Sequence, residues 1–192
     1  MTAPLIIVSG LPRSGTSIMM RMLEAGGLPI VNDEQRTADE DNPRGYFEDT
    51  RVKKLKDDNS WLSAPDLAGQ GVKIISLLLY NIPPGVRAKV IFMDRRMKEV
   101  LASQKKMLLR QNQGLDGIPD EMMAHKFKMH LAALRDWLEE NKDLKCLRVS
   151  YHDAVAKPAV CAARVAKFLQ GVELDQEAMV AAVDPTLYRN RS

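Results

Sequence analysis

Residues 6–17, which read IIVSGLPRSGTS, constrain the fold of this chain more than any other segment. An apolar run rich in β-branched residues ends at Gly10, a short loop follows, and a helical pattern begins after Gly15. A strand, a glycine-bounded loop and a helix form a common cradle for phosphate, because the backbone N–H groups and the dipole at the start of the helix both favour an anion. The segment therefore predicts an anion-binding loop in an α/β fold.

The loop resembles a nucleoside triphosphate loop with one replacement. Gly10 and Gly15 occupy the glycine positions of the pattern G-x-x-x-x-G-K-[ST], and Ser17 occupies its last position. Thr16 stands where that pattern has a lysine, which with Mg²⁺ neutralises triphosphate charge. The segment therefore raises the question of which anion the loop holds.

The loop offers other donors in place of the lysine. Arg13 supplies a planar, fixed positive charge, and hydroxyl groups come from Ser14, Thr16 and Ser17. The alternative interpretation is a tight strand-to-helix turn that binds no ligand.

Short apolar runs alternate with helical patterns along the rest of the chain. Strands are expected at residues 5–9, 72–75, 89–93 and 145–149, and helices from the loop to Gly26, at 49–62, 97–111, 121–140, from Pro158 onward, and at 175–183. Strand centres that are continuously apolar are typical of parallel strands covered on both faces. The pattern predicts one domain over residues 1–192, with three α/β/α layers around a mostly parallel sheet, as in P-loop nucleotide hydrolases.

The charge and the cysteine content indicate which class of ligand and which cellular compartment to expect. A net charge of +3 is mild, which suits small anionic ligands and gives no indication of nucleic acid. Cys146 and Cys161 form no CxxC pair and no zinc pattern, so we expect no metal site and two reduced, mostly buried thiols in a cytoplasmic protein. Because the sequence has no basic, apolar N-terminal segment and no apolar run of membrane-spanning length, we expect neither a signal peptide nor a membrane partner.

A second motif follows the third expected strand. The apolar run ends at Asp94, Arg95 comes next, and Ser103 lies eight residues beyond Arg95 on the following helix. An arginine at the strand end and a serine on that helix could close on one phosphate group. Taken alone, a surface arginine and a serine that bonds its own backbone are the simpler interpretation.

Together the two motifs resemble the sulfotransferase family, which uses 3′-phosphoadenosine 5′-phosphosulfate. Residues 12–17 are similar to the family's loop P-[KR]-S-G-T-[ST], which binds the 5′-phosphosulfate, and Arg95 and Ser103 match its arginine and serine on the 3′-phosphate. Residues 147–155, LRVSYHDAV, resemble a strand and turn common in bacterial members, with His152 in place of the usual glutamate. The resemblance extends from about residue 5 to about residue 170. It implies metal-independent transfer of a sulfuryl group to a hydroxyl or amine on a small-molecule, carbohydrate or peptide acceptor.

The resemblance also suggests catalytic residues. A sulfuryl donor has no triphosphate, so the loop lysine and magnesium are less needed, and Arg13 and Lys73 are the candidate cations. Lys73 lies before the strand that leads to Arg95, as the lysine of the segment K-T-H-L-P does in cytosolic members. The histidine of that segment acts as the general base, and Ile75 stands at its position here. Glu48 is the candidate general base, because other branches of the family use a glutamate. The alternative for Lys73 is a lysine at a strand end that reaches water. The alternative for Glu48 is a carboxylate at the start of a helix, where the helix dipole favours it.

Two other functions stay open. A kinase or nucleotidase would use Asp94, at the end of the apolar run VIFMD, to hold magnesium. A non-catalytic nucleotide-binding module would account for the missing histidine. In the favoured interpretation, residues 31–46 and 112–119 contact the acceptor, while Arg189 and Arg191 either close over the 3′-phosphate or form a frayed tail.

Overall fold

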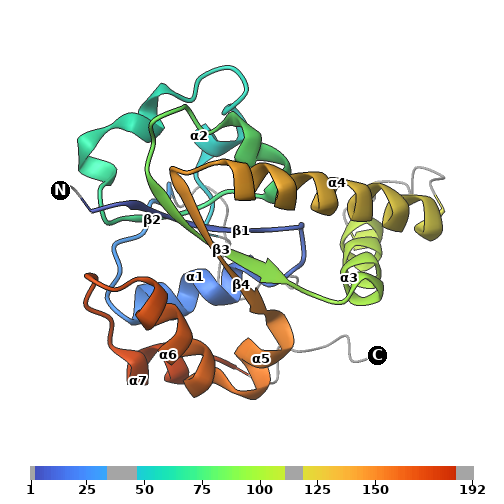
Figure 1. Ribbon diagram of the computed structural model, residues 1–192. Helices are drawn as coiled ribbons and strands as arrows, with labels where there is room; N and C mark the ends of the chain where they lie inside the picture. Colours follow the sequence, from blue (N-terminus) through green and yellow to red (C-terminus); the bar gives the residue numbers. More distant parts are fainter. Residues whose placement is uncertain (1–2, 34–46, 111–118, 185–192) are drawn as a thin grey trace.

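A parallel sheet of four strands forms the centre of the protein, for which a computed structural model describes residues 3–33, 47–110 and 119–184. The strands lie in the order β2-β1-β3-β4, and every neighbouring pair is parallel (Figure 1). Their bounds are β1 (Leu5–Gly10), β2 (Gly71–Lys73), β3 (Ala88–Asp94) and β4 (Leu144–Ser150). The predicted α/β class and parallel sheet are confirmed.

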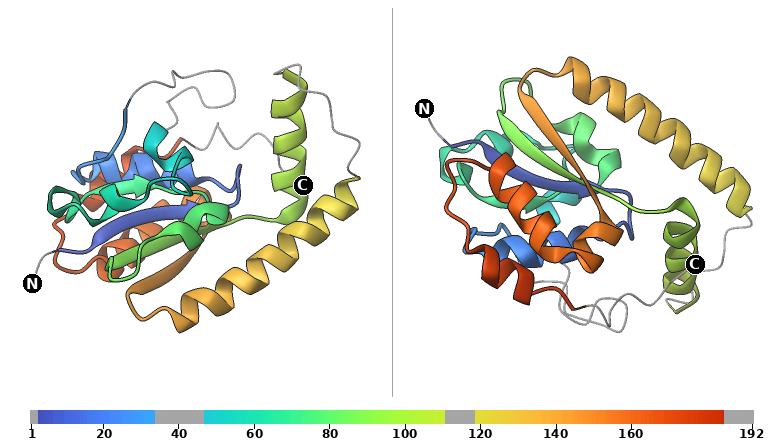
Figure 2. Two further views of the ribbon diagram at one scale, coloured as in Figure 1. Left: turned by 90° about the horizontal axis from the view of Figure 1, so that it is seen from above. Right: turned by 60° about the horizontal axis from the view of Figure 1, so that its bottom comes forward.

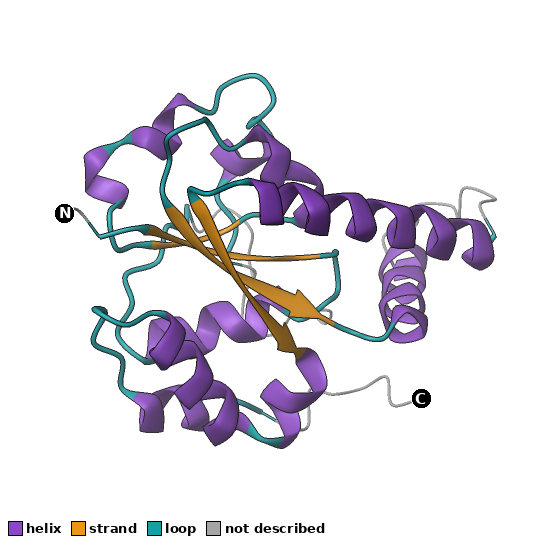
Figure 3. Cartoon of the chain, viewed as in Figure 1, coloured by secondary structure: helices purple, strands orange, loops and turns teal. Residues whose placement is uncertain are grey.

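Helices follow the strands in chain order, and Figure 3 shows them on both sides of the sheet. They are α1 (Thr16–Ala25), α2 (Thr50–Lys53), α3 (Met97–Arg110), α4 (Asp120–Glu140), α5 (Tyr151–Ala156), α6 (Pro158–Phe168) and α7 (Gln176–Ala181). Three 3₁₀ segments, η1 (Ser60–Ser63), η2 (Pro65–Leu67) and η3 (Ser76–Asn81), lie between β1 and β3. The long helix α4 buries Phe127, Leu134 and Leu138, as the spacing of its apolar residues predicts.

The sheet separates two apolar layers, because neighbouring side chains on a strand point to opposite faces. Ile6 and Val8 of β1 pack with α1, α5, α6 and α7 on one face. Leu5 and Ile7 pack with α2, the 3₁₀ segments and α4 on the other face. Figure 2 shows these layers, and they agree with the predicted three-layer architecture.

The helices α3 and α4 meet at the carboxyl edge of the sheet. A small separate cluster joins Leu11 of the first loop, Val100 of α3 and Phe127 of α4. This packing fixes the start of α3 beside the loop that follows β1, which matters for the site described below.

The prediction of one helix over residues 49–62 is wrong. The helix α2 has only four residues, and turns lead from it to η1. Asp58 accepts hydrogen bonds from both the backbone N–H and the hydroxyl of Ser60, at 3.0 and 2.6 Å. Such local side-chain bonds compete with helical hydrogen bonds, so the chain turns although Val52, Leu55 and Leu62 remain buried.

The expectations for β4 and for the two thiols need correction. As the last strand of the sheet, β4 exposes Lys145, Cys146 and Arg148, so it is not covered on both faces. Cys146 is therefore exposed, whereas Cys161 on α6 is buried and burial raises its pKa to about 11. On the same helix Val160, expected on the apolar side, points to solvent.

Several predictions concern residues beyond the described part. Most of residues 31–46, nearly all of residues 112–119, and both Arg189 and Arg191 lie outside it. Within the described part, no helix combines the length and the apolar composition that crossing a membrane requires.

We expect Leu134→Ala to lower the free energy of unfolding by about 2–5 kcal/mol, because Leu134 is 1% exposed and its truncation leaves a cavity under α4. The matched control is Leu109→Ala on α3, where the side chain is 56% exposed and we expect a change within about 0.5 kcal/mol. Urea unfolding followed by circular dichroism measures both. Equal effects of the two substitutions would contradict the assigned core.

Candidate functional site

The loop after β1 has a backbone that only glycine permits at two positions. Gly10 has a φ of 150° and Gly15 a φ of 99°. A Cβ atom at Gly10 would lie 2.6 Å from the carbonyl oxygen of Met93, and one at Gly15 would overlap the ring of Tyr151. The glycines therefore let the loop fold tightly against β3 and α5.

The helix α1 begins at this loop without a side-chain cap. Gly15 is the N-cap residue, and the hydrogen bond from Ile18 N to Gly15 O, at 3.1 Å, opens the helical ladder. The N–H groups of Thr16 and Ser17 precede that bond, so this end of the helix can receive an anion. Among the predicted hydroxyl donors Ser17 is half-buried, whereas Ser14 is 1% exposed and its hydroxyl lies against Gly10.

A hydrogen bond joins the two motifs found in the sequence. The Arg13 Nε donates to Ser103 Oγ at 2.9 Å, across 90 positions of the chain. Ser103 is buried on α3, and Arg13 has a positive φ of 70° within the loop. The loop guanidinium therefore contacts the α3 hydroxyl directly, at the point where the two motifs meet.

Arg95 is held from three directions. Its Nη1 donates to the Arg13 carbonyl oxygen at 3.1 Å, and its Nε pairs with Glu99 Oε2 at 2.9 Å. Its guanidinium carbon lies 4.2 Å from the centre of the Tyr151 ring, a cation–π distance. The side chain is 8% exposed, so it keeps one orientation beside the loop.

Lys73 and Glu48, both predicted from the resemblance, form an ion pair. The Lys73 Nζ lies 3.3 Å from Glu48 Oε1, and Lys53 Nζ lies 3.7 Å from the other carboxylate oxygen. Lys73 is 6% exposed and ends β2, beside Val8 of β1 in the sheet register. This pair therefore belongs to the same carboxyl edge of the sheet as the loop.

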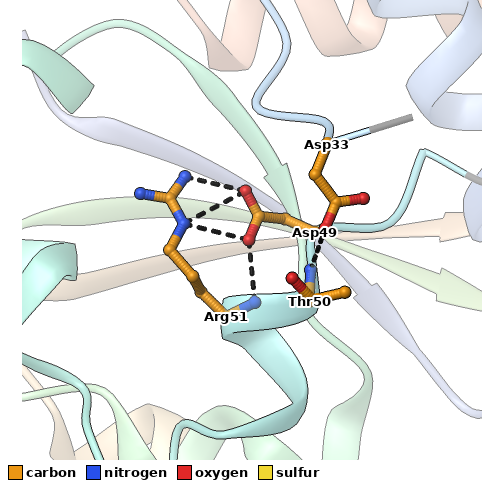
Figure 4. A network of polar contacts seen from close by, with 4 residues as sticks. All are labelled: Asp33, Asp49, Thr50 and Arg51. Carbon is orange, nitrogen blue, oxygen red and sulfur yellow. Dashed lines mark hydrogen bonds and ion pairs between the residues drawn. The ribbon is translucent and has the colours of Figure 1, made fainter. Parts of the chain in front are cut away.

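A polar network fixes the backbone next to Glu48 (Figure 4). The Asp49 carboxylate caps α2 by accepting from Arg51 N at 2.8 Å, and it also pairs with the Arg51 guanidinium at 2.7 Å. Asp33 accepts from Thr50 N at 2.6 Å, and its own N–H donates to Glu48 O at 3.3 Å. The hydrogen bonds that the Arg51 guanidinium donates to the Asp49 carboxylate raise the pKa of Arg51. Our sequence reasoning missed this network, although an aspartate before a helix is a recognisable cap.

The remaining candidates have other partners. Asp94, which a kinase would use for magnesium, pairs with Arg148 at 2.6 Å. His130, a histidine on α4, has its Nε2 3.0 Å from Ser76 Oγ, and burial lowers its pKa. Within residues 3–33, 47–110 and 119–184, no three His, Cys, Asp or Glu side chains gather as a metal site would need.

A comparison with protein families identifies the chain. The sequence model of the sulfotransferase domain matches residues 3–191. This protein belongs to the sulfotransferase family. A search of curated proteins finds no match.

Solved structures of sulfotransferases share the fold. The sulfotransferase domain from the curacin biosynthetic pathway is 14% identical with a TM-score of 0.54, over 98% of this chain and 79% of that one. A sulfotransferase from Alicyclobacillus acidocaldarius is 12% identical with a TM-score of 0.51, over 100% of this chain and 98% of that one. At these identities the likeness shows the fold alone.

We expect Gly15→Ala to destabilise the protein more than Gly171→Ala. Both glycines have a positive φ near 95°, which costs an alanine roughly 1–2 kcal/mol, but a Cβ atom meets the Tyr151 ring at Gly15 and open space at Gly171. Thermal unfolding of the two variants separates the clash from the shared backbone strain. Equal melting temperatures would contradict the close contact between the loop and α5.

Proposed function

We propose that this sulfotransferase moves a sulfuryl group from 3′-phosphoadenosine 5′-phosphosulfate to a hydroxyl or amine, without a metal ion. The acceptor is a small molecule, a carbohydrate or a peptide. The contact between Arg13 and Ser103 carries the proposal, because it joins the residue types expected at the two ends of the nucleotide. We propose a single domain over residues 1–192, in a reducing cytoplasm that suits the free thiols of Cys146 and Cys161.

The described residues fit a bisphosphorylated nucleotide. The uncapped start of α1 would offer N–H groups to the 5′-phosphosulfate, and Arg13, Ser14, Thr16 and Ser17 of the same loop are the residues we propose to bind it. Arg95 and Ser103 would hold the 3′-phosphate, through charge-assisted bonds from a guanidinium that is already oriented. Because Arg13 touches Ser103 and Arg95 touches the Arg13 carbonyl, the two phosphate positions share one scaffold.

The donor supplies an activated sulfuryl group, whose bond to the 5′-phosphate oxygen breaks as the acceptor attacks sulfur. Glu48 would take the proton that leaves the acceptor hydroxyl or amine. Lys73, 3.3 Å from Glu48, offers a buried positive charge beside that carboxylate at the edge of the sheet. Arg13 and the loop N–H groups would stabilise the charge that develops on the leaving 5′-phosphate oxygen.

A kinase is the second candidate function, because the carboxylate of Asp94 lies at the end of β3. It would need Asp94 to hold magnesium, but in the structure that half-exposed carboxylate pairs with Arg148 at 2.6 Å. Thr16 also stands in place of the lysine that kinases of this loop type use. A sugar kinase from Janibacter sp. with a TM-score of 0.45 and 11% identity, over 95% of this chain and 99% of that one, is too distant to support a kinase.

Calorimetric titration with 3′-phosphoadenosine 5′-phosphate tests nucleotide binding. We expect metal-independent binding, and a loss of about 10- to 100-fold in affinity for Arg95→Ala, because a charge-assisted hydrogen bond contributes roughly 1.5–3 kcal/mol. The matched control is Arg96→Ala, an exposed neighbour whose loss should change affinity by less than about threefold. Binding of ATP with magnesium, without binding of the bisphosphate, would overturn the proposal in favour of a kinase.

Glu48→Gln tests the general base. We expect transfer of labelled sulfate to a panel of phenols, alcohols and amines to fall by about 10²- to 10⁴-fold, since the glutamine cannot accept the proton. The control is Lys53→Gln, which removes the longer and more exposed of the two lysine contacts to Glu48 and should leave the rate within about threefold. A rate unchanged by Glu48→Gln would exclude Glu48 as the base, and it would not contradict the proposed nucleotide site. Bisphosphate binding without transfer to any acceptor would favour a non-catalytic module.

A further inference from the structure

We propose that His152 is a positioning residue of the nucleotide site, which acts on Arg95 through the buried carboxylate of Glu99. Binding of a 3′-phosphorylated nucleotide would then be linked to uptake of a proton by His152. This inference rests on the proposed function of Arg95, and the experiment below separates the two.

The Glu99 carboxylate has a different basic neighbour on each oxygen. Its side chain is 0% exposed, Oε2 lies 2.9 Å from Arg95 Nε, and Oε1 lies 3.1 Å from His152 Nε2. A buried carboxylate requires compensating positive charge or hydrogen bonds; here the Arg95 guanidinium supplies them, and a protonated His152 would add a second positive charge. A protonated imidazole would compete with Arg95 for the negative charge of Glu99. Less of the positive charge of Arg95 would then be neutralised by Glu99.

Arg95 can transmit this change because its surroundings leave it little freedom. The Tyr151 ring lies against its guanidinium, and the Arg13 carbonyl accepts from its Nη1. The same Tyr151 ring contacts Gly15 of the loop. His152 follows Tyr151 directly on α5, so the imidazole is attached to the element that supports both Arg95 and the loop.

His152 is partly accessible to solvent. Its side chain is 26% exposed, although its Nε2 atom is buried against Glu99, and an imidazole is the side chain whose charge can change between pH 5 and 8. Among the charged groups of the described residues, Glu99 of α3 contacts the imidazole directly, and Arg95 lies behind Glu99 on the same carboxylate. The neighbour on its own helix is the Tyr151 ring, whose centre is 6.0 Å from that of His152.

Charge counting gives the direction of the linkage. With a neutral imidazole, Arg95, Glu99 and His152 sum to zero charge, and protonation of His152 raises the sum to +1. A phosphate on Arg95 favours the more positive state, so bound nucleotide favours protonated His152. By reciprocity, the proton strengthens nucleotide binding to the same extent.

The experiment is calorimetric titration of the whole chain with 3′-phosphoadenosine 5′-phosphate, at pH 6.0 and pH 8.0 and in two buffers of different ionisation heat. We expect the wild type to take up more protons on binding than His152→Gln does. Relative to His152→Gln, we expect about 2.5- to 6-fold more affinity gained between pH 8.0 and pH 6.0, as a coupling of about 0.5–1 pKa unit gives for an imidazole of ordinary pKa. The comparison with His152→Gln removes the titration of the ligand's own phosphates, whose second pKa is near 6.

His125→Gln is the matched control, because His125 is exposed on α4 and should retain the wild-type pH profile. If His152→Gln does not fold, NMR titration of the wild type gives the same answer. With three histidines in the chain, the bisphosphate should raise the pKa of His152 alone. Identical pH profiles for the wild type and His152→Gln, or a His152 pKa unmoved by the ligand, would overturn this inference and leave the proposed function standing. Absence of bisphosphate binding at either pH would instead refute the proposed function.

Discussion

The register between β1 and β3 is the constraint on which the candidate site depends. Gly10 pairs with Met93 at the carboxyl end of the sheet, so the chain leaves both strands at the same edge. The loop with Arg13 and the turn with Arg95 therefore emerge side by side, and α3 returns Ser103 to within 2.9 Å of Arg13 Nε. A slip of one residue in this register would turn every side chain of the strand to the opposite face and separate the two motifs.

Charge compensation accounts for how the cations at this edge are held. Lys73 pairs with Glu48 and Arg95 with Glu99, and each cation is at least nine-tenths buried. A buried ion pair is weak support for stability, because desolvation offsets much of the attraction. The positions of these pairs beside an uncapped helix start are better explained by a requirement to orient positive charge toward an anion.

The fold and the main motifs could be predicted because their signals are local. The apolar run before Gly10, the spacing of Phe127, Leu134 and Leu138, and the eight residues from Arg95 to Ser103 are all visible in one sequence. By contrast, the helix predicted at residues 49–62 fails because the turn at Asp58 depends on side-chain hydrogen bonds that competed locally with the helix.

Partners that meet only through tertiary structure could not be predicted from sequence. Asp33 holds the backbone of Thr50 from 17 positions away, and Glu99 brings His152 toward Arg95 from a different helix. No sequence spacing encodes these contacts. The exposed side of β4 was missed for a related reason, since strand order decides which strand lies at the edge.

The central claim is that two motifs, 90 residues apart in sequence at Arg13 and Ser103, form one nucleotide site. A crystal structure of the chain with 3′-phosphoadenosine 5′-phosphate tests this claim most directly. We expect the 3′-phosphate within hydrogen-bond distance of Arg95 and Ser103, and the 5′-phosphate at the N–H groups that open α1. A nucleotide that reaches the loop while its 3′-phosphate points away from Arg95 and Ser103 would contradict it.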